Sequence, residues 1–175
     1  MTRRCSPSFS LKRQCCPHCG RTGTLNRHSR ILGNDPGRAD AQRLRGQRAF
    51  CSNRGRRGGC GRTVAIFFAE VLPRHSVTTG LLTRLLSGLQ QGGSLKAVAE
   101  ALGAPFALET FYRLRQRLRR RLDQMRVCLH REQRPPRSTQ SDPLLQTFEH
   151  LRCAFPGEPD PAAGFQGHFQ RAILG

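Results

Sequence analysis

The sequence predicts an α+β protein: a small β ribbon, then a group of helices that includes one long basic helix, then an irregular C-terminal tail. Three observations predict it. Cysteines are concentrated in the first 60 residues, a β-branched and aromatic run occupies residues 63–71, and from residue 78 onward apolar residues recur at helical spacing. We expect a disordered basic segment over residues 1–13, the ribbon over 14–72, the helices over 76–134, and a linker, a short helix and the irregular tail over 135–175.

The cysteines of the ribbon are spaced as metal ligands. Cys16 and Cys19 are separated by two residues in a turn that ends at Gly20. Two thiolates so placed hold one edge of a tetrahedral zinc ion, and Cys51 and Cys60 supply the opposite edge. The sequence therefore predicts one structural Zn²⁺ bound by these four cysteines, in a segment of the zinc-ribbon type.

The spacing of the second pair leaves the fourth ligand open. Eight residues separate Cys51 from Cys60, whereas an ordinary ligand pair is separated by about two to four. Cys15, His18 and His28 are the alternative ligands, although Cys15 directly precedes a predicted ligand and two adjacent cysteines rarely reach one metal. A set of unconnected buried or reactive thiols is the remaining interpretation.

Three strands are predicted around the cysteines. Residues 25–32 and 43–50 flank residues 33–37, whose sequence Gly-Asn-Asp-Pro-Gly is typical of a reverse turn. Residues 63–71 are β-branched and aromatic, and form the third predicted strand. The ribbon is therefore expected to be a small antiparallel sheet.

Two short helices are predicted before the long one. Leucines at helical spacing predict a helix over residues 81–89, with one of the threonines at positions 78 and 79 as its cap. Ser94 is placed to cap a second helix over residues 95–102. Gly103 follows where that helix is expected to end.

A long amphipathic helix begins near residue 107. Its apolar residues recur at an average spacing of 3.6 residues, and arginines fill most of the remaining circumference. A stripe of this length also suggests a homodimer through this helix. A solvated amphipathic helix is the alternative. The apolar stripe consists of Phe111, Leu114, Leu118, Leu122, Met125 and Leu129.

The charge of the chain favours a polyanionic partner. The 30 basic and 11 acidic residues give a net charge of +19, and only two of the basic residues are lysines. The planar fork of arginine suits phosphate and guanine, so nucleic acid is the simplest such partner. Because residues 1–134 carry the whole excess of positive charge, we expect the binding surface there.

Other function classes are disfavoured. The longest apolar run, residues 64–69, is too short to cross a bilayer, and residues 1–16 contain no apolar leader, so we expect no membrane partner and a reducing cytoplasm. The acidic residues do not fall on the alternating strands and helices that a metal-dependent phosphoryl-transfer core requires. We therefore predict no catalytic residues, no other cofactor and no enzymatic activity.

The helices on either side of Gly103 follow each other as in a helix-turn-helix, in which the last helix enters the major groove of DNA. The turn around residues 103–106 is expected to be longer than usual. We predict double-stranded DNA as the partner and the first half of the long helix as the contact surface. The candidate residues are Glu109, Thr110, Tyr112, Arg113, Gln116, Arg117 and Arg120.

The order of a cysteine-rich ribbon and a helix-turn-helix resembles DNA-binding proteins of bacterial insertion sequences, both small regulators and the N-terminal regions of transposases. Four motifs carry the resemblance: Cys-Pro-His-Cys at 16–19, Arg-Ala-Phe-Cys-Ser at 48–52, Cys-Gly-Arg-Thr at 60–63, and Leu-Lys-Ala-Val-Ala-Glu-Ala-Leu-Gly at 95–103. The resemblance implies binding to terminal inverted repeats or to the element's own promoter, at the bacterial nucleoid. The spacing of the second cysteine pair and the longer turn depart from the pattern.

The leading hypothesis is thus a sequence-directed DNA-binding protein of a mobile element, either a transposase-associated repressor or an accessory that binds the element's ends. One alternative is a zinc-ribbon module that contacts a polymerase or a transposase catalytic subunit. Another is an RNA-binding protein. The single tyrosine and the ten phenylalanines, most of them at apolar core positions, offer few stacking platforms for RNA.

Overall fold

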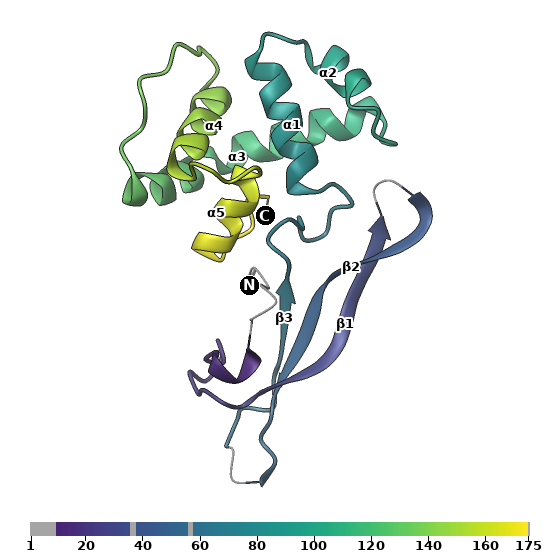
Figure 1. Cartoon of the computed structure of the whole chain (residues 1–175), viewed down its shortest axis with the longest axis vertical. Coiled ribbons are helices and arrows are strands. Elements are labelled where there is room, and N and C mark those ends of the chain that lie inside the picture. The colour runs from purple at the N-terminus through teal and green to yellow at the C-terminus, as the bar shows by residue number, and fades with distance from the viewer. Residues whose placement is uncertain (1–9, 36–37, 56–57, 175) are drawn as a thin grey trace.

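The structure is a computed structural model that describes residues 10–35, 38–55 and 58–174. Over these residues the fold is α+β, as predicted, with a three-stranded antiparallel sheet followed by five α-helices (Figure 1). A short 3₁₀ helix, η1 (Leu11–Arg13), precedes the sheet. The other elements are β1 (Leu25–Asp35), β2 (Arg38–Cys51), β3 (Thr63–Phe67), α1 (Thr79–Gln90), α2 (Leu95–Ala101), α3 (Leu108–Glu132), α4 (Pro143–Ala154) and α5 (Pro161–Phe169).

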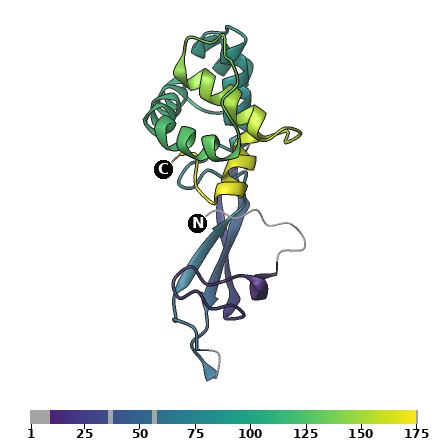
Figure 2. The same cartoon turned by 90° about the vertical axis from the view of Figure 1, so that its left-hand side faces the viewer.

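The helices gather at one end of the molecule and the sheet extends away from them (Figures 1 and 2). The strand order is β1-β2-β3, with both neighbouring pairs antiparallel. β3 pairs only with residues 46–50 of β2, whereas β1 and β2 remain paired as far as Asp35 and Arg38. Residues 31–35 and 38–45 therefore form a two-stranded extension beyond β3, which we call the β arm. Both strands are longer than the sequence predicted.

The sheet has a small core of its own. Leu25, Ala49, Val64 and Ile66 are buried together with two cysteines, and Leu11 packs against them. Leu11 belongs to η1, so residues 11–13 are ordered on the sheet, although the sequence predicted disorder there. The rest of the predicted disordered segment, residues 1–9, lies outside the described residues. A core of this size gives limited hydrophobic stabilisation, and small folds of this kind usually need a further constraint.

The first two helices lie within two residues of their predicted bounds at each end. The Thr78 side chain accepts a hydrogen bond from the backbone N–H of Leu81 at the start of α1, and Ser94 caps α2 in the same way. Gly103 follows α2 with a φ of +57°, a left-handed conformation that favours glycine. Where α1 meets α2, a Cβ at Gly88 would lie 2.6 Å from a methyl carbon of Val98, so only a glycine permits this approach.

The apolar stripe of α3 is covered by the chain itself. Phe111, Leu118 and Leu129 belong to one core cluster with side chains of α1, α2, α4 and α5 and with Ile173. The contact between α3 and α4 is extensive, and Figure 1 shows α4 and α5 beside the last turns of α3. The stripe that suggested pairing with a second copy is therefore buried within one chain. The prediction of a homodimer through α3 was based on this stripe, and the stripe no longer supports it.

The prediction of an irregular C-terminal tail is wrong for residues 161–169, which form α5. Gln166 of this helix is fully buried, and its side-chain amide donates hydrogen bonds to the carbonyls of Ala69 and Val71, while its Oε1 accepts one from the N–H of Ile173. Asp160 caps α5 and accepts hydrogen bonds from two threonine hydroxyls of α1. Residues 143–174 thus complete the helical core and fix it to the segment that leaves the sheet.

Asp142 is the carboxylate that neutralises one side of α3. Its Oδ1 accepts a hydrogen bond from the N–H of Leu144 at the start of α4, and Arg115 and Arg119 each lie 2.9 Å from its Oδ2. Burial alone would raise the pKa of Asp142, but these hydrogen bonds and charges outweigh burial and lower the pKa below its ordinary value. A carboxyl group with a lowered pKa stabilises the fold above its unfolded pKa of 3.8, and this contribution is lost as the pH falls through the folded value.

We therefore expect Asp142→Asn, which retains a capping side chain, to lower the free energy of unfolding by about 1–2 kcal/mol at neutral pH, because two charge-assisted bonds at a partly exposed site are lost. Urea unfolding of both proteins at neutral pH and near pH 3 measures the difference. The difference in the free energy of unfolding between the two proteins should be smaller at the lower pH. Equal stabilities at neutral pH would show that the two ion pairs contribute nothing.

No helix in the described part of the chain combines the length and the apolar content needed to span a bilayer.

Candidate metal centre and cationic surface

Four cysteine thiols converge beside the start of β1, where Leu25 pairs with Cys51. This end of the sheet lies away from the helices (Figure 1). The Sγ atoms of Cys16, Cys19, Cys51 and Cys60 all lie within 4.8 Å of one another. Cys16 and Cys60 are 3.7 Å apart at Sγ, and Cys19 and Cys51 are 3.8 Å apart. These separations far exceed the roughly 2.05 Å of a disulfide bond, so the thiols are free. Four free thiols at these distances form a site that can bind a metal ion.

The two cysteine pairs are held by matching turns. In the first, the N–H of Gly20 donates to the carbonyl of Cys16, and in the second the N–H of Gly61 donates to the carbonyl of Cys51. Both glycines have a φ of +71°. The same closing hydrogen bond therefore forms in both pairs, although eight residues separate the cysteines of the second pair and only two separate those of the first.

Gly59 explains how the longer loop closes on the site. Its N–H donates to the carbonyl of Ser52, 2.9 Å away. A Cβ at this position would collide with that carbonyl and would lie 2.7 Å from Sγ of Cys51. The loop between the second pair of cysteines can therefore return to the metal site only because residue 59 has no side chain.

Neighbouring groups favour a thiolate at Cys51. Its Sγ lies 3.2 Å from the hydroxyl of Thr24 and accepts a hydrogen bond from the backbone N–H of Cys60. Burial alone would raise the pKa of Cys51, but these hydrogen bonds and those from the neighbouring thiols lower it to about 6. Burial raises the pKa of Cys16 to about 11, and hydrogen bonds with the side chains of Cys51 and Cys19 also raise it. A bound dication would supply the charge that lets all four become thiolates.

The alternative ligands do not join this group. Cys15 is exposed and its Sγ lies 3.9 Å from the hydroxyl of Thr22. His28 instead makes an edge-to-face contact with Phe50, with ring centroids 6.3 Å apart. Among the described residues, the four predicted cysteines are the set of histidine, cysteine and acidic side chains close enough to share one ion, and His18 is not part of it.

The second predicted site lies on the exposed side of α3. Six of its seven candidate residues are exposed, and Tyr112 has 53% of its surface accessible. Thr110 is half-buried in the first turn of the helix. The structure thus places the candidates on one element and leaves them accessible. The exposed residues are Glu109, Tyr112, Arg113, Gln116, Arg117 and Arg120.

The arginines of α3 divide into two groups. On the side that faces α4, Arg115 and Arg119 bind Asp142, and Arg126 donates to the hydroxyl of Thr147 and to the carbonyl of Pro143. On the exposed side, the guanidinium groups of Arg113 and Arg120 have no hydrogen bond or ion pair with any described residue. The exposed side of α3 therefore presents positive charge that the fold itself does not neutralise.

His75 joins this surface to the sheet, a role that the sequence did not reveal. Its ring nitrogens lie 3.0 and 3.3 Å from Nη1 of Arg117, and its backbone carbonyl accepts a hydrogen bond from Arg45 of β2. Burial lowers the pKa of His75, and the charges of Arg117 and Arg45 lower it further. Because a guanidinium group can only donate, a ring nitrogen of His75 accepts the hydrogen bond from Arg117. A lone histidine in a connecting segment carries no sequence signal for such a contact.

No protein-family model, no curated protein and no solved structure matches this chain. A function must therefore be inferred from the cysteine cluster, the exposed side of α3 and the remaining surface of the molecule.

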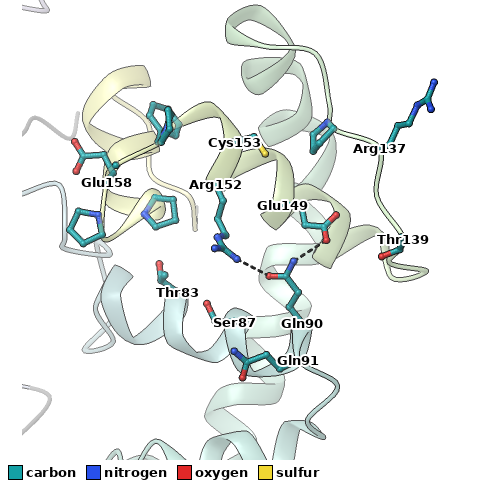
Figure 3. Close-up of a pocket in the computed structure, with 16 residues that line it drawn as sticks. Thr83, Ser87, Gln90, Gln91, Arg137, Thr139, Glu149, Arg152, Cys153 and Glu158 are labelled. Carbon is teal, nitrogen blue, oxygen red and sulfur yellow. Dashed lines mark hydrogen bonds between the residues drawn. The ribbon is translucent and has the colours of Figure 1, made fainter.

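An open depression of about 980 Å³ lies between α1, α4 and the segments around residues 136–139 and 155–161 (Figure 3). Gln90 crosses its floor, where it donates to Glu149 at 2.9 Å and accepts from Arg152 at 3.4 Å. The carboxylate of Glu149 and the guanidinium group of Arg152 thus both bind the side-chain amide of Gln90. The residues that line this depression do not form a nucleophile with a base, and the prediction of no catalytic residues stays a prediction.

Proposed function

We propose that the four cysteines bind one structural zinc ion and that residues 14–72 form a zinc ribbon. Zinc–thiolate bonds of about 2.3 Å in a tetrahedron place the sulfurs about 3.8 Å apart. The measured 3.7 and 3.8 Å between two pairs of Sγ atoms agree with that edge. Four protein ligands fill the tetrahedron, so the ion has no open position for substrate or water. The small core of the sheet supports a role for the metal in folding.

We propose further that the protein binds double-stranded DNA through α3, with α1 and α2 as the supporting helices of a helix-turn-helix. The observation that carries this proposal is the exposed side of α3, where Arg113, Gln116 and Arg120 are accessible and no described carboxylate neutralises the arginines. α2 packs against both α1 and α3, as the helix before a recognition helix does. Six residues separate α2 from α3, which is longer than the usual turn.

The resemblance to proteins of bacterial insertion sequences gives this DNA-binding proposal a biological setting. In that setting the chain acts at the nucleoid as a repressor of the element's promoter or as an accessory that binds the element's ends, where it meets the transposase catalytic subunit. What supports this assignment is the order of the two units in one chain, cysteine-held sheet first and basic helix later.

Binding to a labelled DNA duplex over a range of salt concentrations tests the proposed function. Each phosphate that an arginine neutralises contributes about 0.9 to the slope of log affinity against log salt. With Arg113, Arg117 and Arg120 as the proposed arginine contacts, we expect a slope of at least about 2.7 and competition by duplex DNA that is stronger than competition by structured RNA. A flat salt response would contradict DNA binding, and stronger competition by RNA would favour the RNA-binding alternative.

A further inference from the structure

A small polar cavity of about 330 Å³ lies between the last turns of α3, the segment that follows α3 and the middle of α4. This volume is at the lower end of the range typical of small-ligand sites. None of the candidate residues for DNA contact lines the cavity, so it is a separate feature of the helical region. No described acidic residue lines it either. Its polar lining consists of Arg126, His130, Ser138, Gln146, Thr147 and His150.

Arg126 brings a positive charge to this cavity that the fold does not neutralise. Its Nε donates to the hydroxyl of Thr147 at 2.9 Å, and its Nη2 donates to the carbonyl of Pro143 at 3.0 Å. Both acceptors are neutral, and no carboxylate lies within ion-pair distance of Arg126 among the described residues. The side chain is half-buried, so its guanidinium group has lost part of its hydration. A bound anion would therefore stabilise it.

Three carboxylates carried by or next to α3 and α4 already have other partners. Glu132 lies 2.9 Å from Nε2 of His168. Glu149 accepts a hydrogen bond from Gln90, and Asp142 binds two other arginines of α3. None of the three supplies a counter-charge at the cavity, so an anion bound there would have to come from outside the chain.

Two histidines complete one side of the cavity. His150 has only 2% of its surface accessible, and its Nε2 lies 2.8 Å from the carbonyl oxygen of Gln133. Because a carbonyl can only accept, Nε2 of His150 carries the hydrogen. His130 is exposed, and its ring centroid lies 5.5 Å from that of His150, with the ring planes at 80°. The buried ring is thus held in place, while the ring of His130 is accessible to a ligand.

We propose that this cavity binds a phosphate group, with Arg126 as the charged anchor and His130 and Ser138 as further donors. The inference does not rest on the proposed DNA binding. The two hydrogen bonds of Arg126 leave further N–H groups on its guanidinium, whose planar fork suits the paired oxygens of a phosphate. The hydroxyl oxygen of Ser138 accepts from the N–H of Gln140, and its own hydrogen remains to donate. The phosphate would be either free in solution or carried by a nucleotide.

Titration with inorganic phosphate and with a nucleoside monophosphate tests the site in the full zinc-loaded chain, with imidazole NMR signals as the readout. The signals of His130 and His150 should shift and saturate, whereas that of His28, which contacts Phe50 in the sheet, should not move. A local readout is needed because exposed arginines elsewhere also attract phosphate. Equal affinity for the two probes identifies free phosphate as the ligand, and tighter binding of the monophosphate identifies a nucleotide.

Two variants and a matched control identify the residues that bind the phosphate. Arg126→Gln should weaken binding about tenfold or more, because hydrogen bonds to charged groups are the stronger ones. His130→Gln, followed by the signal of His150, should weaken binding about threefold, since one hydrogen bond is lost. Arg131→Gln removes the same charge from an exposed residue outside the cavity and should leave the affinity unchanged.

The proposal is overturned if neither probe produces a saturating shift at His130 or His150. It is also overturned if Arg126→Gln and Arg131→Gln weaken binding equally, because phosphate would then respond only to net charge. Circular dichroism checks that each variant is folded. If Arg126→Gln does not fold, His130→Gln decides the question, because this exposed side chain has no hydrogen bond to any described residue, and an unchanged affinity in that variant would overturn the proposal.

Discussion

Replacing Cys19 by serine is expected to abolish stoichiometric zinc binding and to unfold the sheet. Structural zinc sites contribute about 10–16 kcal/mol of apparent binding free energy, which is also folding free energy. Among the described residues, the sheet core consists of six buried residues, two of which are themselves cysteines of the cluster. Metal analysis should find one zinc per unaltered chain and much less than one in the variant, and the amide signals of residues 14–67 should lose their dispersion in NMR spectra.

Cys15→Ser is the matched control for this experiment. Cys15 is next to a proposed ligand in the sequence, but its side chain is exposed and contacts Thr22 rather than the cluster. The Cys15→Ser variant should bind one zinc and keep the NMR spectrum of the unaltered chain. Because the helices have a separate core cluster, they should remain folded in Cys19→Ser. Full zinc occupancy in Cys19→Ser, or loss of zinc in Cys15→Ser, would contradict the proposed ligand set.

A triple substitution of Arg113, Arg117 and Arg120 by glutamine is expected to weaken duplex binding about 100-fold or more at moderate salt. An arginine that makes a bidentate contact to a base contributes about 1–3 kcal/mol. The salt slope should also fall by about 2.7, since three phosphate contacts are lost. These side chains are exposed, and only Arg117 has a hydrogen-bond partner, His75, so the fold should persist. Fluorescence anisotropy with a labelled duplex measures both quantities.

The control removes equal charge from another part of the helical region. Arg131, Arg134 and Arg137 are exposed at the end of α3 and in the segment that follows it. Their replacement by glutamine should change affinity only slightly, through the weaker long-range field. If both triple variants lose affinity to the same extent, the protein binds DNA through its net charge and α3 has no special role.

The cysteine cluster was largely predictable because its signal is local. Two cysteines separated by two residues and followed by glycine define one half of a tetrahedral site, and the structure brings Cys51 and Cys60 to the other half. What the sequence left undecided was the fourth ligand, because eight residues separate Cys51 from Cys60. The answer depends on Gly59, whose close contact with the carbonyl of Ser52 exists only once the loop is folded. Thr24 was missed for the same reason, since a threonine before a strand gives no sign that it will face a thiol.

The helices were predictable where periodicity and caps agreed. Ser94 and Gly103 mark the ends of α2, and the 3.6-residue stripe marks α3. α5 was missed because its Pro-Ala-Ala-Gly-Phe-Gln-Gly sequence has no apolar stripe. Its order comes instead from tertiary contacts, such as those between Gln166 and the carbonyls of Ala69 and Val71, about 95 residues earlier.

The division of the arginines on α3 also depends on tertiary structure. Their sequence spacing showed a broad basic flank, but it gave no reason to separate Arg115 and Arg119 from Arg113 and Arg120. Asp142 makes that separation from the start of α4, 23 residues beyond Arg119. The β arm was likewise underestimated, since the turn residues at 33–35 that suggested an early reversal instead continue β1.

Arginine-selective chemical modification, read by mass spectrometry with and without a DNA duplex, tests the central claim most directly. The claim is that DNA covers the exposed guanidinium groups in the first half of α3 that the fold leaves without a carboxylate. The account predicts that duplex DNA slows the modification of Arg113, Arg117 and Arg120 while Arg131 and Arg134 react at unchanged rates. Equal rates at the first three arginines with and without DNA, under conditions where the duplex is bound, would contradict it.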